Sequence, residues 1–219
     1  MGADEFDKLS ALDQDINFAH INQRLLDAAM FHETNRCRVE NELPPLTHLT
    51  PLDDAAAMHA RDMIARKYVG HVEKDNPDTR NPIDRVRKAG LDAMFVSENA
   101  ALAYGIQYDP GRDVFPLSQW HREGLSYRGD GPAIPPHTYR SFAQTLVKMW
   151  MDSPAHRANI LMRGSQSLGV ACLEQPVKGK SVENEFHRFY CVQVFCTLKQ
   201  RRAAPTTGPQ RFDDQNEGD

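Results

Sequence analysis

The sequence predicts an α+β domain, with helices along most of the chain and strands near its end. Apolar residues recur at helical spacing in several segments between residues 20 and 161. Two later segments, 168–173 and 189–198, are rich in residue types that favour strands. A polar stretch joins these two segments, which suits an antiparallel pair. Helices and an antiparallel sheet in one chain define the α+β class.

Length and composition indicate one domain with additional segments. The chain has 219 residues, of which 40% are hydrophobic, enough for one good core. The first residues are polar and acidic, and we expect them to become helical only near Ile16 and Phe18. The expected divisions are an N-terminal arm (1–19), a single domain (20–199) with a long insertion at about 105–140, and a disordered C-terminal tail (200–219).

Charge and hydropathy exclude several classes of partner. The net charge is -4 and the isoelectric point is near 6.1, with both signs interspersed, so we expect no nucleic-acid partner and no anionic membrane surface. No apolar run reaches the roughly 18 residues of a membrane span, so the chain is not expected to span a membrane. The first residues, Met1-Gly-Ala-Asp-Glu-Phe, lack the basic and apolar regions of a signal peptide, but such a start is also what remains after a signal peptide has been removed, so it does not settle localisation.

Three helices are expected before residue 91. The first covers about 20–39 on one apolar stripe, and prolines at 44 and 45 follow it. The second begins at Thr50-Pro51 and ends near Lys67, and its many alanines predict close packing on another element. The third begins at Asn81-Pro82 and stops at Gly90.

Two polar residues stand out around these helices. His71 lies just beyond the second helix, on a connecting segment of the kind that often presents functional side chains. Glu98 interrupts an apolar segment, and a buried carboxylate needs a partner. From its residues alone, Glu98 is either part of a salt bridge or backbone hydrogen bonds, or functional.

The region from 105 to 140 is rich in glycine and proline and reads as a long loop or flap that packs in part through its aromatic residues. We expect His121 and His137, which lie in it, at the surface.

A further helix from Tyr139 leads to Ser153, an expected N-cap that starts a new helical turn. His156 falls in that first turn, where the helix dipole disfavours imidazolium, so it is either a metal ligand or base or simply a packed histidine.

The four cysteines show no CxxC pairing, which excludes zinc-ribbon and thioredoxin-type sites. They are either buried thiols or one or two disulfides in an oxidising compartment. In the expected strand pair, Cys172 and Cys191 would lie nearly opposite each other; the other two are Cys37 and Cys196.

Several short motifs together resemble the CAP superfamily, also called the SCP-like or pathogenesis-related-1-like domain, in its short bacterial form. The resemblance covers roughly residues 28–198. The motifs are Asn35-Arg36 with Pro44-Pro-Leu46, Leu52-Asp-Asp-Ala-Ala with His59-Ala-Arg-Asp-Met63, Gly70-His71, Ala89-Gly90-Leu91, Ser97-Glu-Asn-Ala100, Trp150-Met-Asp-Ser-Pro-Ala-His-Arg-Ala-Asn-Ile-Leu161, Leu168-Gly-Val170 and Val192-Gln-Val-Phe195. The resemblance implies a three-layer α-β-α sandwich, in which helices cover both faces of a small antiparallel sheet.

The resemblance also implies a cleft built on His71, Glu98 and His156. Two imidazoles and a carboxylate could hold zinc or another divalent metal, with Glu98 as ligand, as orienting partner or as base for a bound water. No organic cofactor is implied. Ser153 stands where eukaryotic members carry a further glutamate, so the acidic set is incomplete, and the neighbouring Asp152 is expected to point elsewhere. The long insertion is unusual for the short form and could cover the cleft.

Three functions from different classes follow. The first is a secreted or periplasmic module whose cleft binds a metal and a small, lipid-like, peptide or cell-wall ligand. The second is a metal-assisted hydrolase with Glu98 as general base, for which the chain offers no G-x-S-x-G or H-E-x-x-H motif. The third is a structural or interaction module in which the three residues form only a polar network.

Overall fold

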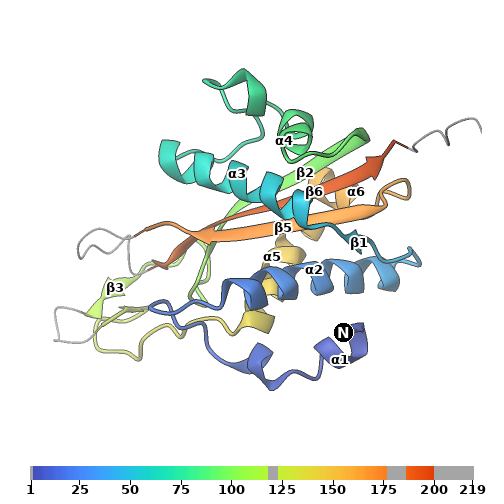
Figure 1. The fold of residues 1–219 in the computed structure, drawn as a ribbon. Helices are drawn as coiled ribbons and strands as arrows, with labels where there is room; N and C mark the ends of the chain where they lie inside the picture. The colour runs from blue at the N-terminus through green and yellow to red at the C-terminus, as the bar shows by residue number, and fades with distance from the viewer. Residues whose placement is uncertain (1, 118–122, 177–185, 200–219) are drawn as a thin grey trace, which may run out of the picture.

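The computed structural model is a three-layer α-β-α sandwich, with helices above and below one sheet (Figure 1). It describes residues 2–117, 123–176 and 186–199. The expected disorder of 200–219 and the expected surface position of His121 lie outside these residues. Within them, no helix is long and apolar enough to cross a bilayer. The predicted fold class is confirmed.

The sheet has four strands in the order β1-β5-β6-β2. β5 (Ser167–Glu174) and β6 (Arg188–Leu198) pair antiparallel, as the sequence predicts, with Cys172 opposite Cys191. β2 (Ala93–Tyr104) pairs antiparallel with β6, and the short β1 (Thr47–His48) runs parallel to β5. β2 was not predicted as a strand, because small apolar residues occupy successive positions and leave no alternation for its sequence to show.

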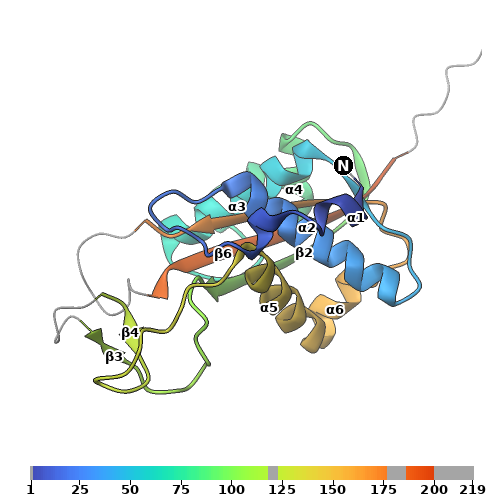
Figure 2. The ribbon, with the colours of Figure 1, turned by 90° about the horizontal axis from the view of Figure 1, so that it is seen from below.

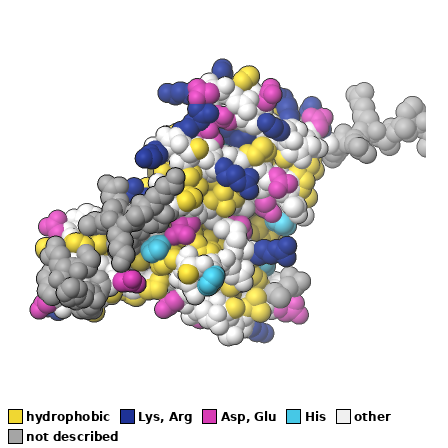
Figure 3. Space-filling model, turned by 60° about the vertical axis from the view of Figure 1, so that its left-hand side comes forward, with side chains coloured by type: hydrophobic (Ala, Val, Ile, Leu, Met, Phe, Trp, Pro, Cys, Tyr) yellow, Lys and Arg dark blue, Asp and Glu magenta, His cyan; other side chains and the backbone are white. Residues whose placement is uncertain are grey.

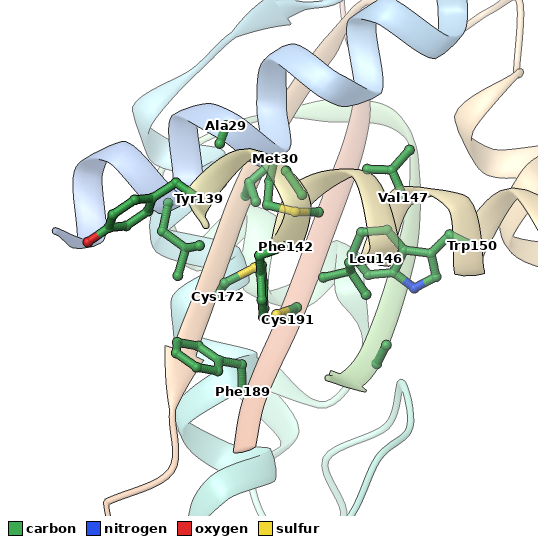
Figure 4. Packing of buried hydrophobic residues seen from close by; sticks show 14 of the residues in the cluster. Ala29, Met30, Tyr139, Phe142, Leu146, Val147, Trp150, Cys172, Phe189 and Cys191 are labelled. Carbon is green, nitrogen blue, oxygen red and sulfur yellow. The ribbon is translucent and has the colours of Figure 1, made fainter. Parts of the chain in front are cut away.

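One face of the sheet is covered by α2 (Gln23–Glu40) and α5 (Tyr139–Asp152). The core on this face is built from large side chains, including Trp150, Phe142 and Phe189, all almost fully buried. Figure 4 shows these rings packed between α5 and the strands, with Met30 of α2 above Phe142. This layer is held by bulky apolar packing, the largest favourable term in folding.

The other face is covered by α3 (Thr50–Arg66) and α4 (Pro82–Lys88). Ala55, Ala56 and Ala60 of α3 are fully buried against the sheet. At Gly169 of β5 an added Cβ would lie 2.2 Å from the Leu52 carbonyl carbon, so only glycine lets α3 approach this closely. The close packing predicted from the alanines is confirmed.

The N-terminal arm packs beneath α2 and α5 (Figure 2). Its helical turns are α1 (Ala3–Phe6) and the 3-10 helix η1 (Ser10–Asp13), and they bury Phe6 and Leu12. Ile16 is buried too but lies outside any helix, where its N–H bonds the carbonyl of His137. The prediction of helix near Ile16 and Phe18 was therefore wrong; tertiary contacts, not local periodicity, order this segment.

The insertion carries a short hairpin, β3 (Phe115–Pro116) with β4 (Leu125–Ser126), and a small core of its own around Ile106, Leu125 and Ile134. Its aromatic residues meet Phe18, Tyr104 and Phe186, at the end of β2 farther from α4. His137 was expected at the surface but is buried, edge-on to Phe142 and bonded through Nδ1 to the Ser141 hydroxyl. Burial lowers its pKa to about 4.

Candidate functional site

His71, Glu98 and His156 come from three separate parts of the fold. α3 ends at Lys67, which adopts a left-handed conformation (φ 55°), and the chain then turns into the loop that carries His71. Glu98 lies midway along β2, and His156 lies in the first turn of α6 (Pro154–Ile160). The structure adds two residues that the sequence analysis did not select, His59 and Arg85. We call these five residues the Glu98 cluster.

The centre of the cluster is a buried ion pair. Arg85 Nη2 lies 2.7 Å from Glu98 Oε2, and each side chain is 1% exposed. Arg85 also donates to the Thr79 carbonyl, at the end of the 3-10 helix η2 (Pro77–Thr79), at 2.8 Å. The guanidinium partner and the further hydrogen bonds offset the desolvation of this buried carboxylate, whereas either charge alone would be strongly unfavourable.

The other oxygen of Glu98 orients His71. His71 Nδ1 lies 3.0 Å from Glu98 Oε1. An ionised carboxylate only accepts hydrogen bonds, so Nδ1 must donate, and the lone pair of a neutral His71 is then on Nε2. The His71 side chain is 47% exposed. Its free nitrogen is therefore available to a ligand from solvent.

His59 supports the loop that carries His71. Its Nε2 lies 2.6 Å from the Gly70 carbonyl, which accepts, and 3.5 Å from Glu98 Oε1. The ring is fully buried and its Nδ1 has no hydrogen-bond partner among the described residues. Burial lowers the pKa of His59 despite the nearby Glu98 charge, so the ring stays neutral. His59 thus holds the residue before His71 in place.

Two asparagines dock α6 on β2 and so place His156. Asn159 Nδ2 donates to the Glu98 carbonyl at 3.0 Å and to Asn99 Oδ1 at 2.9 Å. Asn99 Nδ2 in turn donates to the His156 carbonyl at 3.2 Å. Burial, and then the charge of His71, lower the pKa of His156.

The start of α6 differs in one detail from the sequence prediction. Ser153 is at the N-cap and Pro154 follows it, as predicted, but the Ser153 side chain makes no capping hydrogen bond. Asp152 lies beside Lys148, 2.6 Å from its Nζ, on the exposed side of α5. Asp152 therefore points away from the Glu98 cluster, as expected.

Within the Glu98 cluster, the histidines rather than Glu98 are the groups that could ligate a metal. Both Glu98 oxygens are engaged, one by Arg85 and one by His71. Across the described ranges, no three His, Cys, Asp or Glu side chains are grouped as ligands of one ion. The imidazoles of His71 and His156 are the groups of this cluster that could ligate a metal, and Glu98 would then be the carboxylate that fixes a ligating histidine.

A second set of carboxylates lies at the opposite edge of the sheet, where it lines a cavity of about 600 Å³ with Arg24, Phe31 and His48. Beyond the short β1, Asp53 accepts the N–H of Val170 at 2.8 Å and Asp27 accepts that of Cys172 at 2.9 Å. Burial raises the pKa of Asp27 to about 7. We call this region the Asp27 edge. The sequence analysis missed it, since Asp27 reads as a polar position on an amphipathic helix.

Surface charge on the side that Figure 3 shows is mixed. Lys and Arg alternate with Asp and Glu, and hydrophobic side chains form a band between them. This face therefore carries no single-sign patch.

Comparison with known proteins identifies the family. The model of the CAP family, described as the cysteine-rich secretory protein family, matches residues 31–195. The chain belongs to the CAP family. The resemblance inferred from the motifs is thus confirmed, and the match includes every member of the Glu98 cluster. No curated protein matches the chain significantly in sequence.

Solved structures show the same CAP fold. One is an extracellular protein containing an SCP domain from Bacillus anthracis str. Ames, with a TM-score of 0.50 and 21% identity over 80% of this chain. This chain spans 41% of that protein's length. Another is an outer surface protein from Borrelia burgdorferi, with a TM-score of 0.50, 16% identity, and coverage of 78% of this chain and 92% of the other. At these identities the likeness concerns the fold.

Proposed function

We propose that this CAP domain acts outside the cytoplasm, as a secreted or periplasmic binding module, and that the Glu98 cluster holds a divalent metal such as zinc. His71 and His156 are the ligands, and Glu98 orients His71. The observation that carries the proposal is the chain Arg85–Glu98–His71: a buried guanidinium holds a carboxylate that leaves the outward nitrogen of a half-exposed imidazole free. The extracellular and outer-surface neighbours support the location.

A bound metal would supply a Lewis acid that polarises an oxygen of the ligand. The residues themselves do the rest: His59 fixes Gly70, the asparagines fix α6, and Glu98 holds the proton of His71 at Nδ1. Two protein ligands leave positions for a small, lipid-like, peptide or cell-wall ligand with an oxygen donor. No nucleic acid is proposed as a partner, and no organic cofactor.

The hydrolase alternative requires Glu98 to accept a proton from water. Both of its oxygens already accept hydrogen bonds, one from His71 and one from the buried Arg85, so neither is free to take a proton from water. This argues against Glu98 as general base and favours binding over hydrolysis. The remaining alternative, a polar network without ligand, gives the opposite result in the experiment that follows.

Calorimetric titration of zinc into metal-free protein tests the proposal. We expect about one equivalent to bind, and we expect His71→Ala and His156→Ala to abolish binding, since each removes a ligand. Glu98→Gln should weaken binding by roughly 10–100-fold, because an orienting partner is lost.

His48→Ala is the matched control. His48 is 48% exposed and its Nε2 lies 2.6 Å from Asp53 Oδ2, so it too is a half-exposed imidazole bonded to a carboxylate, but at the Asp27 edge. Its loss should leave zinc binding unchanged. Absence of binding by the wild type, or equal losses in all three histidine variants, would reject the Glu98 cluster as a metal site.

A further inference from the structure

Cys172 and Cys191 form a directly opposed pair on the two central strands of the sheet. They are register partners in the β5–β6 ladder and both are fully buried. Both belong to the core on the α2 and α5 face. Figure 4 shows the two side chains projecting from neighbouring strands beside Phe142. In the structure both are free thiols.

The backbone of Cys172 identifies the type of pair. Its N–H donates to Asp27 Oδ1 and its carbonyl accepts from Gln23 Nε2, so both groups point to α2 and away from β6. Cys172 and Cys191 are therefore a non-hydrogen-bonded pair, the type in which opposed Cα atoms lie closest, at about 4.5 Å. A disulfide needs a Cα separation of roughly 4.4–6.8 Å. The backbone already satisfies this requirement.

We propose that Cys172 and Cys191 are a disulfide-forming pair, oxidised when the chain folds in an oxidising compartment. The other cysteines do not compete. Cys196 follows Cys191 by an odd number of residues, so it projects to the opposite face, where it belongs to the α3 and α4 core. Cys37 lies on α2, at the margin of the core. This inference is independent of the metal proposal.

The oxidation balances by thiol–disulfide exchange with a low-molecular-weight disulfide such as oxidised glutathione. One cysteine thiolate attacks the glutathione disulfide, forms a mixed disulfide and releases one glutathione thiolate. The second cysteine thiolate then attacks the protein sulfur of the mixed disulfide and releases the other. The protons of the two protein thiols pass to the two glutathione thiolates, and the protein is lighter by two hydrogen atoms.

Burial fixes the timing of this reaction. It raises the pKa of both thiols, and the Asp27 carboxyl adds to the effect. The thiolate is the reactive form, so the pair reacts while the strands are still open and becomes inert in the folded core. The oxidised protein should resist reductant until it unfolds.

Refolding of reduced, denatured protein in a mixture of reduced and oxidised glutathione tests the proposal. Free thiols are then alkylated in denaturant, and the tryptic digest is analysed by mass. Cleavage places Cys172 in peptide 164–178 and both Cys191 and Cys196 in peptide 189–199. The Cys196→Ala variant, from the opposite face, therefore decides which cysteine of the second peptide is joined.

We expect peptides 164–178 and 189–199 to be linked in the wild type and in Cys196→Ala, and unlinked in Cys191→Ala. The bond closes a loop of about 20 residues, so oxidised protein should melt roughly 6–12 °C above reduced protein. If Cys191→Ala does not fold, the link in Cys196→Ala still decides the pairing. Four alkylated cysteines in refolded wild type, or a link that uses Cys37 or Cys196, would overturn the proposal.

Discussion

The Glu98 cluster and the Asp27 edge place buried carboxylates at opposite edges of one sheet. The two carboxylates differ in the charge of their hydrogen-bond partners. Glu98 meets the positive charge of Arg85 at 2.7 Å. Asp27 meets only neutral donors, the side-chain amide of Gln23 and the N–H of Cys172, both on one oxygen. Desolvation is opposed by a full charge in the first case and by hydrogen bonds alone in the second, and the pKa of Asp27 rises to about 7.

This contrast assigns different roles to the two regions. Glu98, held by Arg85, accepts from His71 Nδ1 and so can keep the proton of a neutral His71 on that nitrogen. Asp27 changes charge near neutrality, and in doing so it changes the stability of the sheet edge. The partner therefore decides the behaviour of the buried carboxylate: Glu98 has a full positive charge beside it, whereas Asp27 has only neutral donors and titrates near neutrality.

The largest effect should come from removing the charge that balances Glu98. Arg85→Met leaves the carboxylate buried and unpaired, and we expect a loss of about 3–5 kcal/mol in the free energy of unfolding, measured by urea denaturation. The double variant Arg85→Met with Glu98→Met should recover most of that loss. Arg87→Met, which removes an exposed partner of Asp84, should cost under about 0.5 kcal/mol. Equal losses of stability in Arg85→Met and Arg87→Met would contradict the claim that Arg85 balances the buried charge of Glu98.

The next effect should come from pH at the Asp27 edge. The folded-state pKa of Asp27 lies above the usual 3.8, so the folded protein holds a proton that the unfolded chain has released. That contribution is complete below about pH 4 and is lost as the pH rises through 7, by about 2–4 kcal/mol. Asp27→Asn keeps the acceptor but not the charge, so it should match the wild type near pH 4 and exceed it at pH 8.

Denaturation at both pH values measures this difference. The buried His137, with its lowered pKa, makes the protein more stable as the pH rises through the same range, which opposes the effect of Asp27. The quantity to compare is therefore the difference in unfolding free energy between Asp27→Asn and the wild type at each pH. Asp92→Asn, at an exposed carboxylate paired with Lys199, is the control and should show no such dependence. A variant that tracks the wild type at both pH values would show that Asp27 ionises normally.

The smallest effect should come from the asparagine that docks α6. Asn159→Ala removes the two bonds to β2, and we expect a loss of about 1–2 kcal/mol together with weaker zinc binding, because His156 moves with α6. Asn41→Ala, which removes an exposed local bond to Cys37, should leave both quantities unchanged. Weaker stability with unaltered zinc affinity would separate His156 from the site.

The sequence predicts the helices and the β5–β6 pair well, because each has its own periodicity or β-forming residues. Motifs whose order matches the CAP family also single out His71, Glu98 and His156, and their role as a metal site stays a prediction. The sequence does not reveal Arg85 or His59, since an arginine on a short helix and a histidine among alanines look like ordinary surface and core positions. The sequence does not reveal Asp27 either, because its environment is set by Cys172 of β5, which lies 145 residues away in the chain.

The most direct test of the account is the protonation site of His71, read from the ring-nitrogen chemical shifts of labelled protein at pH 8. The account predicts a proton on Nδ1 and an unprotonated Nε2 in the wild type, with this preference lost in Glu98→Gln. A proton on Nε2 in the wild type, or the same shifts in both proteins, would contradict the claim that Glu98 orients His71 toward a ligand.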